Sequence, residues 1–391
     1  MTGDEPRQGL HEILLACGVS PEWMKAFEAA PRELFLPEVM WPFDDGSDLV
    51  VSRAREPERW RRWADTDVPI TTQWDDGRHI GTEPGEERTS SSSAPSLVFA
   101  MFADLSVDEG MRVLEVGTGT GWCAALLSAR LGEPNVVSVE VDEAVAVRAR
   151  KALSAAGWHP EVVVGDGLLG WPGRAPYDRV LVTAAVREVP RAWIEQTRPG
   201  GVIVVPWGTR HSYQDAIARL VVGEDGTASG HFTRLARFMQ IRSHRLQVRS
   251  ADYIPGNAWP DDTRAAVTGL TASEIVDDPT TTFVLSLLLP DCVRVPGRNA
   301  DGTRGIWLYG LGDRSWAAVF FGEDSRVFQG GPRNLWDEVD AAYRWWSEQC
   351  QPGYEKFGLT ITRDGRQETW LGDPSTPVPN IASAVDSRRE R

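Results

Sequence analysis

The spacing of apolar residues along the chain changes character near residues 105 and 245. In the first stretch, apolar positions recur at helical intervals after Ser20-Pro21 and again after Pro95. The chain between these patterns is charged and irregular, and it ends in the polar run 89–93, whose composition is typical of a flexible linker. We therefore expect residues 1–105 to form an N-terminal lid or substrate segment with helices near both ends.

From residue 106 to about residue 245, short β-branched runs alternate with helical patterns. Strands are expected at 112–116, 136–141, 162–164, 179–183 and 202–205. Strands and helices alternating at this spacing indicate a parallel sheet with crossover helices. The apolar runs 217–222 and 232–238, separated by a glycine-containing turn, predict an antiparallel hairpin that finishes the sheet. The pattern therefore predicts an α/β fold with a Rossmann-like, doubly wound sheet.

Residues 246–391 show a third pattern, with hairpin signals at 305–321 and 359–371 and an amphipathic helix at 335–346. This predicts a C-terminal α+β accessory domain that recognises substrate. Tryptophan is frequent here, and we expect most of these side chains to form the domain core more than a peptide-gripping surface. The tryptophans concerned are Trp307, Trp316, Trp336, Trp345 and Trp346.

Composition narrows the possible partners. Lys and Arg total 41 against 56 for Asp and Glu, a formal charge of −15, which disfavours a phosphate backbone as ligand. No apolar run approaches the roughly 20 residues of a membrane span. The cysteines and histidines show neither metal-ligand nor disulfide spacing. We expect a cytoplasmic protein that binds no metal, nucleic acid or membrane.

The strongest local signal is the glycine loop Gly117-Thr118-Gly119-Thr120-Gly121, directly after the first strand of the sheet. Such a loop lets the backbone approach a ligand at a helix start. Glu140 ends the next strand and is placed to accept hydrogen bonds from ribose hydroxyls. The dinucleotide fingerprint needs a glycine where Trp122 stands, which favours S-adenosylmethionine, with Glu115 suited to its cationic end. NAD binding and a tight turn without ligand are the alternatives.

Gly165-Asp166-Gly167 follows the third strand and is suitably placed to contact an adenine amino group. Asp-Gly is also ordinary turn chemistry, so this segment alone decides nothing.

Together these motifs resemble those of the protein-L-isoaspartate O-methyltransferase family over roughly residues 20–245. The matching segments are 113–122, 165–167, 175–180, 183–185 with 189–190, and 198–201 leading to 205–208. Pro31-Arg32 with Phe35 and Pro37 resembles the family's N-terminal signature, and Ser93-Ala94-Pro95-Ser96 resembles its active-site Ser-x-Pro segment.

The resemblance implies a methyltransferase core at residues 106–245 with S-adenosylmethionine as cofactor. The implied cofactor-binding residues are Glu115, Gly117, Thr118, Gly119, Gly121, Glu140, Val141, Asp166 and Gly167. It implies Ser93 as the catalytic residue that seats a substrate carboxylate; alternatively, Ser93 only caps the helix after Pro95. The implied substrate-binding residues are Ser91, Ser92, Thr183, Val204, Val205 and Pro206.

The implied reaction agrees with the absence of an obvious general base. A side-chain carboxylate has a pKa near ~4 and is already ionised at neutral pH. Methyl transfer to it therefore needs positioning more than proton removal. We expect an enzyme, a carboxyl O-methyltransferase that acts on an Asp or isoAsp residue of a protein or peptide.

The acidic stretch 65–87 and the C-terminal 246–391 depart from the pattern of the repair enzymes. This extended form resembles methyltransferases that accompany ATP-grasp ligases in graspetide-type maturation of ribosomally made peptides (RiPP biosynthesis). That resemblance implies a crosslinked peptide substrate, an upstream peptide ligase as partner, and closure of the methyl ester to a succinimide (aspartimide). The alternatives are isoaspartyl repair of damaged proteins and, from another class, a non-catalytic peptide-binding subunit.

Overall fold

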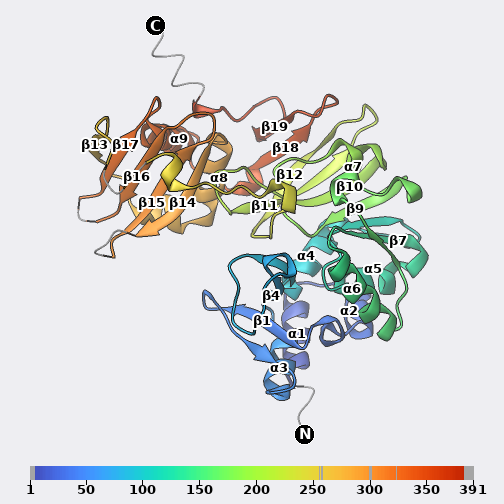
Figure 1. The fold of residues 1–391 in the computed structure, drawn as a ribbon. Helices are drawn as coiled ribbons and strands as arrows, with labels where there is room; N and C mark the ends of the chain where they lie inside the picture. The colour runs from blue at the N-terminus through green and yellow to red at the C-terminus, as the bar shows by residue number, and fades with distance from the viewer. Residues whose placement is uncertain (1–4, 255, 257–258, 299–301, 323, 383–391) are drawn as a thin grey trace. The chain divides into compact units, whose positions relative to one another are not determined.

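A computed structural model describes residues 5–254, 256, 259–298, 302–322 and 324–382 (Figure 1). The chain divides into two compact units. Unit 1 comprises 1–184, 190–205 and 219–228, and unit 2 comprises 185–189, 206–218 and 229–391. The domain boundaries near residues 105 and 245 remain sequence-based predictions, since the compact units interleave along the chain instead of following them.

The N-terminal part of unit 1 contains a small antiparallel sheet and several helices (Figure 1). Its helices are α1 (Glu5–Ala16), α2 (Pro21–Ala29), η1 (Arg32–Phe35), α3 (Pro57–Ala64) and α4 (Pro95–Leu105). Its strands are β1 (Val39–Asp44), β2 (Ser47–Asp48), β3 (Val51–Ser52), β4 (Ile70–Trp74) and β5 (Arg88–Ser92). The helices expected after Ser20-Pro21 and Pro95 are confirmed as α2 and α4.

The expectation of a flexible linker at residues 89–93 is wrong, because most of this run lies in strand β5. Ser92 pairs with Ile70 and Ser91 with Thr71 in the antiparallel ladder to β4. Ser90 and Ser92 alternate as buried residues, as one face of a strand requires. The Ser90 hydroxyl accepts a hydrogen bond from Thr72, so a polar run can be buried here.

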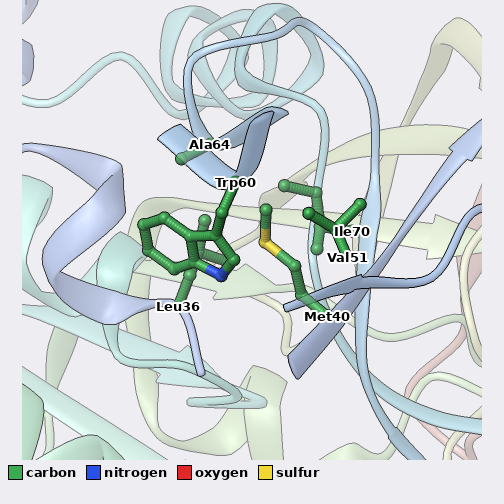
Figure 2. Close-up of a cluster of buried hydrophobic side chains, with 6 residues drawn as sticks. All are labelled: Leu36, Met40, Val51, Trp60, Ala64 and Ile70. Atoms are coloured by element: carbon green, nitrogen blue, oxygen red, sulfur yellow. The ribbon is translucent and has the colours of Figure 1, made fainter. Parts of the chain in front are cut away.

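A buried apolar cluster forms the core of this region, shown in Figure 2. The cluster consists of Leu36, Met40, Val51, Trp60, Ala64 and Ile70. The Trp60 side chain is fully buried, and its indole N–H donates to the carbonyl of Pro37 at 3.1 Å. The buried Trp60 therefore anchors helix α3 to the core. This anchoring fixes the position of the C-terminal end of α3, where the segment after Ala64 begins.

The remainder of unit 1 contains the predicted parallel sheet, with strand order β10-β9-β6-β7-β8. The strands are β6 (Val113–Val116), β7 (Val136–Glu140), β8 (Glu161–Val164), β9 (Tyr177–Val182) and β10 (Thr197–Trp207). Helices α5 (Trp122–Leu131) and α6 (Glu143–Ala155) pack beside β7, and α7 (Arg191–Glu195) precedes β10. All pairings among these strands are parallel. The Rossmann-like fold is confirmed, and the chain order reverses beside β6, where such folds bind ligands.

The strands β11 (Asp215–Val222) and β12 (Ala228–Ala236) are neighbours, as the hairpin prediction requires. Both strands have residues in each unit. Within unit 2, β12 is followed in the sheet by β18 (Phe357–Ile361) and then β19 (Gln367–Leu371), the last two forming the expected antiparallel hairpin.

Unit 2 also contains an antiparallel sheet with strand order β13-β17-β16-β15-β14. Its strands are β13 (Arg264–Val267), β14 (Cys292–Arg298), β15 (Arg304–Gly310), β16 (Trp316–Phe320) and β17 (Arg326–Gly330). The α-helices in the described part of this unit are α8 (Pro279–Leu288) and α9 (Leu335–Glu348). As expected, most of the named tryptophans are core residues: Trp316, Trp336 and Trp346 are buried, and Trp307 and Trp345 are half-buried.

Candidate active site

The glycine loop connects β6 to α5 with a backbone that side chains rarely allow. Gly117, Gly119 and Gly121 have φ angles of +99°, +54° and +89°. A Cβ atom added at Gly117 would lie 2.7 Å from the Thr183 hydroxyl oxygen. One added at Gly119 would lie 3.3 Å from the Ser91 carbonyl oxygen. Strand β5 therefore lies directly against the glycine loop, an approach that the missing side chain permits.

Glu140, at the carboxyl end of β7, joins this loop through its carboxylate. Oε2 accepts a hydrogen bond from the Gly119 N–H at 2.9 Å, and Oε1 accepts from the Asp142 N–H at 3.0 Å. Asp142 in turn accepts at 3.3 Å from the side-chain amide of Gln73, a residue of β4. The hydrogen bonds thus run from the N-terminal sheet to the acid expected to bind a ribose.

Glu115 lies in β6, beneath the loop, and is fully buried. Its Oε2 accepts a 2.5 Å hydrogen bond from Ser138, whose hydroxyl also contacts that of Thr118 at 2.6 Å. Its Oε1 is buried and has no hydrogen-bond partner in the described part of the chain. The pKa of the Glu115 carboxyl is raised to about 8, mainly by burial; the hydrogen bond from Ser138 lowers this pKa, and the nearby Glu140 raises it.

We predict that Glu115→Gln makes the cofactor-free protein less sensitive to alkaline pH. The folded protein holds the Glu115 proton up to about pH 8, whereas the unfolded chain releases it near pH 4.5. The folded state thus binds more protons in this window, and stability falls as pH rises through it. The glutamine amide of the variant has no proton to lose. Between pH 5 and pH 8.5, the melting temperature of Glu115→Gln should therefore fall by at least about 3 °C less than that of the wild type.

The measurement is thermal unfolding of both proteins across this pH range. Glu109→Gln, at an exposed glutamate of the same unit, is the control and should keep the wild-type pH slope. Parallel curves for Glu115→Gln and the wild type would contradict a protonated carboxyl at Glu115.

Around the ends of β7 and β8 the structure exposes apolar and acidic groups side by side. Val141 follows β7 and is 50% exposed, and Val164 ends β8 and is 41% exposed. Asp166 is exposed, and its Oδ1 accepts from the Leu168 N–H at 3.0 Å. A Cβ at Gly167 would lie 2.5 Å from a Val116 methyl group. An exposed apolar surface beside a carboxylate is suited to a purine ring and its amino group.

Ser93 follows β5 and is half-buried. Its carbonyl accepts from Arg32, whereas its hydroxyl makes no hydrogen bond within the described ranges. The N-cap residue of α4 is Ala94, and no N-cap side chain accepts a hydrogen bond from the first turn of the helix. The alternative that Ser93 caps this helix is therefore wrong.

The neighbouring serines differ in what holds them. The Ser92 hydroxyl is buried and accepts from the Arg32 side chain at 2.9 Å. Ser91 is half-buried, and its backbone carbonyl lies close to Gly119 in the glycine loop. Between the two, only Ser91 has side-chain exposure that suits substrate contact.

The other predicted substrate residues lie directly after β9 and within β10. Thr183 is half-buried and donates to the Gly117 carbonyl at 2.6 Å, which places it beside the glycine loop. Val204, Val205 and Pro206 are buried. Because they are buried, these three side chains offer no exposed surface to a peptide. Their role in substrate binding stays a prediction, and their burial does not support it.

Several residues at the site have no clear signal in the local sequence. Gln73 and Asp142 lie 69 residues apart, and their hydrogen bond follows only from the fold. The Trp122 indole is buried and donates to the Ala30 carbonyl at 2.9 Å, so its bulk belongs to the core.

The described residues contain no group of histidine, cysteine or acidic side chains arranged to hold a metal ion. No helix in the described ranges combines the length and apolar character that crossing a bilayer requires. The cysteines Cys17, Cys123, Cys292 and Cys350 are free thiols.

The site fits a nucleoside cofactor that carries a cation. An unpartnered buried oxygen of Glu115, a glycine loop and an acid at the end of β7 all lie at the carboxyl edge of one parallel sheet. The class defined by this fold and site is the S-adenosylmethionine-dependent methyltransferases.

Comparison with known proteins gives the family. A family model described as Protein-L-isoaspartate(D-aspartate) O-methyltransferase matches residues 61–245. The Protein-L-isoaspartate O-methyltransferase of Pyrococcus horikoshii is 39% identical over 219 residues, which span 55% of this chain and 83% of that protein. That of Thermococcus onnurineus is 38% identical over 157 residues, 40% of this chain and 64% of the relative. The chain belongs to the protein-L-isoaspartate O-methyltransferase family, whose reaction is carboxyl O-methylation with S-adenosylmethionine as cofactor.

A solved structure named protein-L-isoaspartate O-methyltransferase has the same fold over almost the whole chain. It aligns with a TM-score of 0.54 at 24% identity, and the alignment covers 94% of this chain and 100% of that one. Most of residues 246–391 therefore have a structural counterpart there. The expectation that the extension sets this chain apart from such enzymes is wrong.

Proposed function

We propose that this protein transfers the methyl group of S-adenosylmethionine to the side-chain carboxylate of an L-isoaspartyl residue in a protein or peptide. The observation that carries this proposal is the packing of the serine strand on the glycine loop, where the Ser91 carbonyl would be only 3.3 Å from a Cβ at Gly119. The strand that leads directly into Ser93 thereby lies beside the loop expected to hold the methyl donor.

The cofactor would be held by groups from the ends of three strands, β6, β7 and β8. Glu140 and Val141 would take the ribose and one adenine face, and Asp166 with Gly167 the adenine edge. Glu115, whose Oε1 lacks a partner, would face the cationic methionine end. The loop of Gly117, Thr118, Gly119 and Gly121 would line the space between them.

When bound, S-adenosylmethionine supplies an electrophilic methyl group and leaves as S-adenosylhomocysteine. The protein's part is to orient an already ionised carboxylate. The Ser93 hydroxyl would donate to one carboxylate oxygen, which leaves the other oxygen directed at the methyl group. Thr183 and Ser91, both half-buried beside the loop, would contact the adjacent peptide.

A second candidate is tailoring of a crosslinked, ribosomally made peptide delivered by an upstream peptide ligase, with the methyl ester closing to an aspartimide. Its support is the hairpin loop between β4 and β5, residues 75–87, which is rich in acidic residues and joins the strand that carries the serines. The C-terminal extension no longer favours this candidate, because a named isoaspartate methyltransferase covers it.

Mass spectrometry with S-adenosylmethionine and three peptides of one sequence tests both candidates. The peptides carry isoaspartate, aspartate, or aspartate beside a ligase-type crosslink. We expect a methyl ester on the isoaspartyl peptide, followed by loss of methanol to the succinimide. Esterification of the crosslinked peptide alone would replace the proposal with peptide tailoring. Binding of peptide and cofactor without turnover would indicate a non-catalytic subunit.

A further inference from the structure

The side chain of Arg32 is fully buried at the start of η1 and donates into two distant chain segments. Nε and Nη2 reach Ser92 and Ser93: Nε donates to the Ser92 hydroxyl, and Nη2 donates to the carbonyls of both residues, all at 2.9 Å. The remaining bonds go to the carbonyls of Ala64, Thr66 and Val68 at 3.0–3.5 Å. One guanidinium thus joins the end of β5 to the chain after α3.

All of these hydrogen-bond acceptors are uncharged. Burial lowers the pKa of Arg32 to about 9, although the nearby Asp67 and Asp65 oppose the shift, so the side chain stays protonated at neutral pH. A buried cation held by carbonyls requires all of its donors to be satisfied, since each lost bond leaves a desolvated group. The acceptors at Ser92 and Ser93 are therefore held in position tightly.

The other end of the serine segment is fastened by Asp67. Its Oδ1 accepts from the Ser96 N–H at 2.9 Å, in the first turn of α4. Arg32 and Asp67 thus hold Ser93-Ala94-Pro95-Ser96 from both ends, and both rely on the segment 64–68. That segment follows the apolar cluster of Trp60 and Ala64 shown in Figure 2.

Arg32 also connects this segment to the glycine loop. Its guanidinium carbon lies 5.5 Å from the ring centroid of Trp122, the residue directly after Gly121. The same indole donates to the Ala30 carbonyl, two residues before Arg32. The contacts of one arginine therefore reach both the serine segment and the helix that the loop begins.

We infer that Arg32 is a positioning residue for methyl transfer, which fixes the backbone of Ser92 and Ser93 so that the Ser93 hydroxyl meets the substrate carboxylate. We call the hydrogen bonds from Arg32 to Ser92 and Ser93 the brace. In this inference Ser92 is part of the brace and does not make the substrate contact that its sequence position had implied. The inference rests on the proposed function, because it assumes that Ser93 seats the carboxylate.

The first test is a double-mutant cycle on kcat with an isoaspartyl peptide, using Arg32→Lys, Ser93→Ala and the double variant. Lysine keeps the charge but has too few donors to hold both segments. We expect Arg32→Lys to lower kcat by about 30-fold and the double variant to be no slower than Ser93→Ala, because the brace acts through that hydroxyl. The Kd for S-adenosylhomocysteine should stay within about 3-fold of the wild-type value.

Arg53→Lys is the matched control. Its guanidinium carbon lies 4.7 Å from the ring centroid of Trp60, but its exposed side chain is not bonded to the serines, so kcat should be unchanged. Multiplicative losses in the cycle, or an equal loss of cofactor affinity, would overturn the inference. If Arg32→Lys fails to fold, Ser92→Ala removes one acceptor and should lower kcat by about 5-fold without affecting S-adenosylhomocysteine binding. Normal kcat in that variant would equally overturn it.

Hydrogen exchange separates failure of this inference from failure of the proposed function, because it needs no substrate. Amides of residues 90–97 should exchange about 10-fold faster in Arg32→Lys than in Arg53→Lys, with the parallel sheet unchanged. Unchanged exchange would refute the brace. A wild-type enzyme without turnover on isoaspartyl peptide would refute the proposed function, whatever the exchange rates.

Discussion

Ser93→Ala should lower kcat for an isoaspartyl peptide by about 100-fold while the melting temperature stays within about 1 °C of the wild type. Loss of one preorganised donor to a reacting group costs about 2.7 kcal/mol of transition-state stabilisation. Stability should be unaffected because the hydroxyl makes no hydrogen bond in the described ranges and Ala94 occupies the N-cap of α4. Single-turnover methylation and thermal unfolding of the same preparations measure the two quantities.

Ser154→Ala is the control for this substitution. Ser154 lies exposed on α6 in the same unit, and its removal should change neither kcat nor melting temperature. Normal turnover in Ser93→Ala would remove Ser93 from the reaction. A lower melting temperature with normal specific activity would instead assign the residue a structural role.

The parallel sheet could be predicted because its determinants are local. Its strands are rich in β-branched residues, and glycine or proline lies between β6 and α5, between α5 and β7, and between α6 and β8. Glu140 could be predicted in the same way, because the acid lies at the end of a recognisable strand. Its hydrogen bond to the Gly119 N–H follows from the pairing of β6 with β7.

Strand β5 could not be predicted, because its buried serine hydroxyls form hydrogen bonds with residues that are distant in the sequence. Ser92 is buried against Arg32, 60 residues earlier, and a polar run without that partner does read as a linker. The same separation concealed the role of Arg32, which the family signature contained but no local pattern connected to the serines. Interactions of this kind set the register of the serine run, which the sequence alone left open.

The boundaries of the compact units also depend on distant pairing. Strand β18 is a neighbour of β12 in unit 2, although 120 residues lie between them in the sequence. The domain boundary near residue 245 therefore stays a prediction from composition alone. Sequence composition reports which residues are apolar, whereas the pairing of strands decides which parts of the chain fold together.

Glu140→Gln should weaken binding of S-adenosylhomocysteine by about 100-fold. Both carboxylate oxygens accept backbone N–H groups, from Gly119 and from Asp142. An amide has one acceptor and one donor group, so in either orientation its NH2 must face one of these N–H groups. The loop then shifts, and the charge-assisted hydrogen bonds to a ribose diol, about 1.5–3 kcal/mol each, are weakened as well. Isothermal titration calorimetry measures the Kd.

Glu143→Gln distinguishes this local effect from a general loss of negative charge. Glu143 is exposed in the first turn of α6, three residues from Glu140, and its substitution removes the same charge without contact to Gly119 or Asp142. Its Kd should match that of the wild type within about 2-fold, since exposed charges contribute little. Equal weakening in both variants would indicate that charge near the sheet edge, and not the paired carboxylate oxygens, determines affinity. Wild-type affinity in Glu140→Gln together with a lower melting temperature would leave Glu140 as a structural support of the loop and would remove it from the cofactor site.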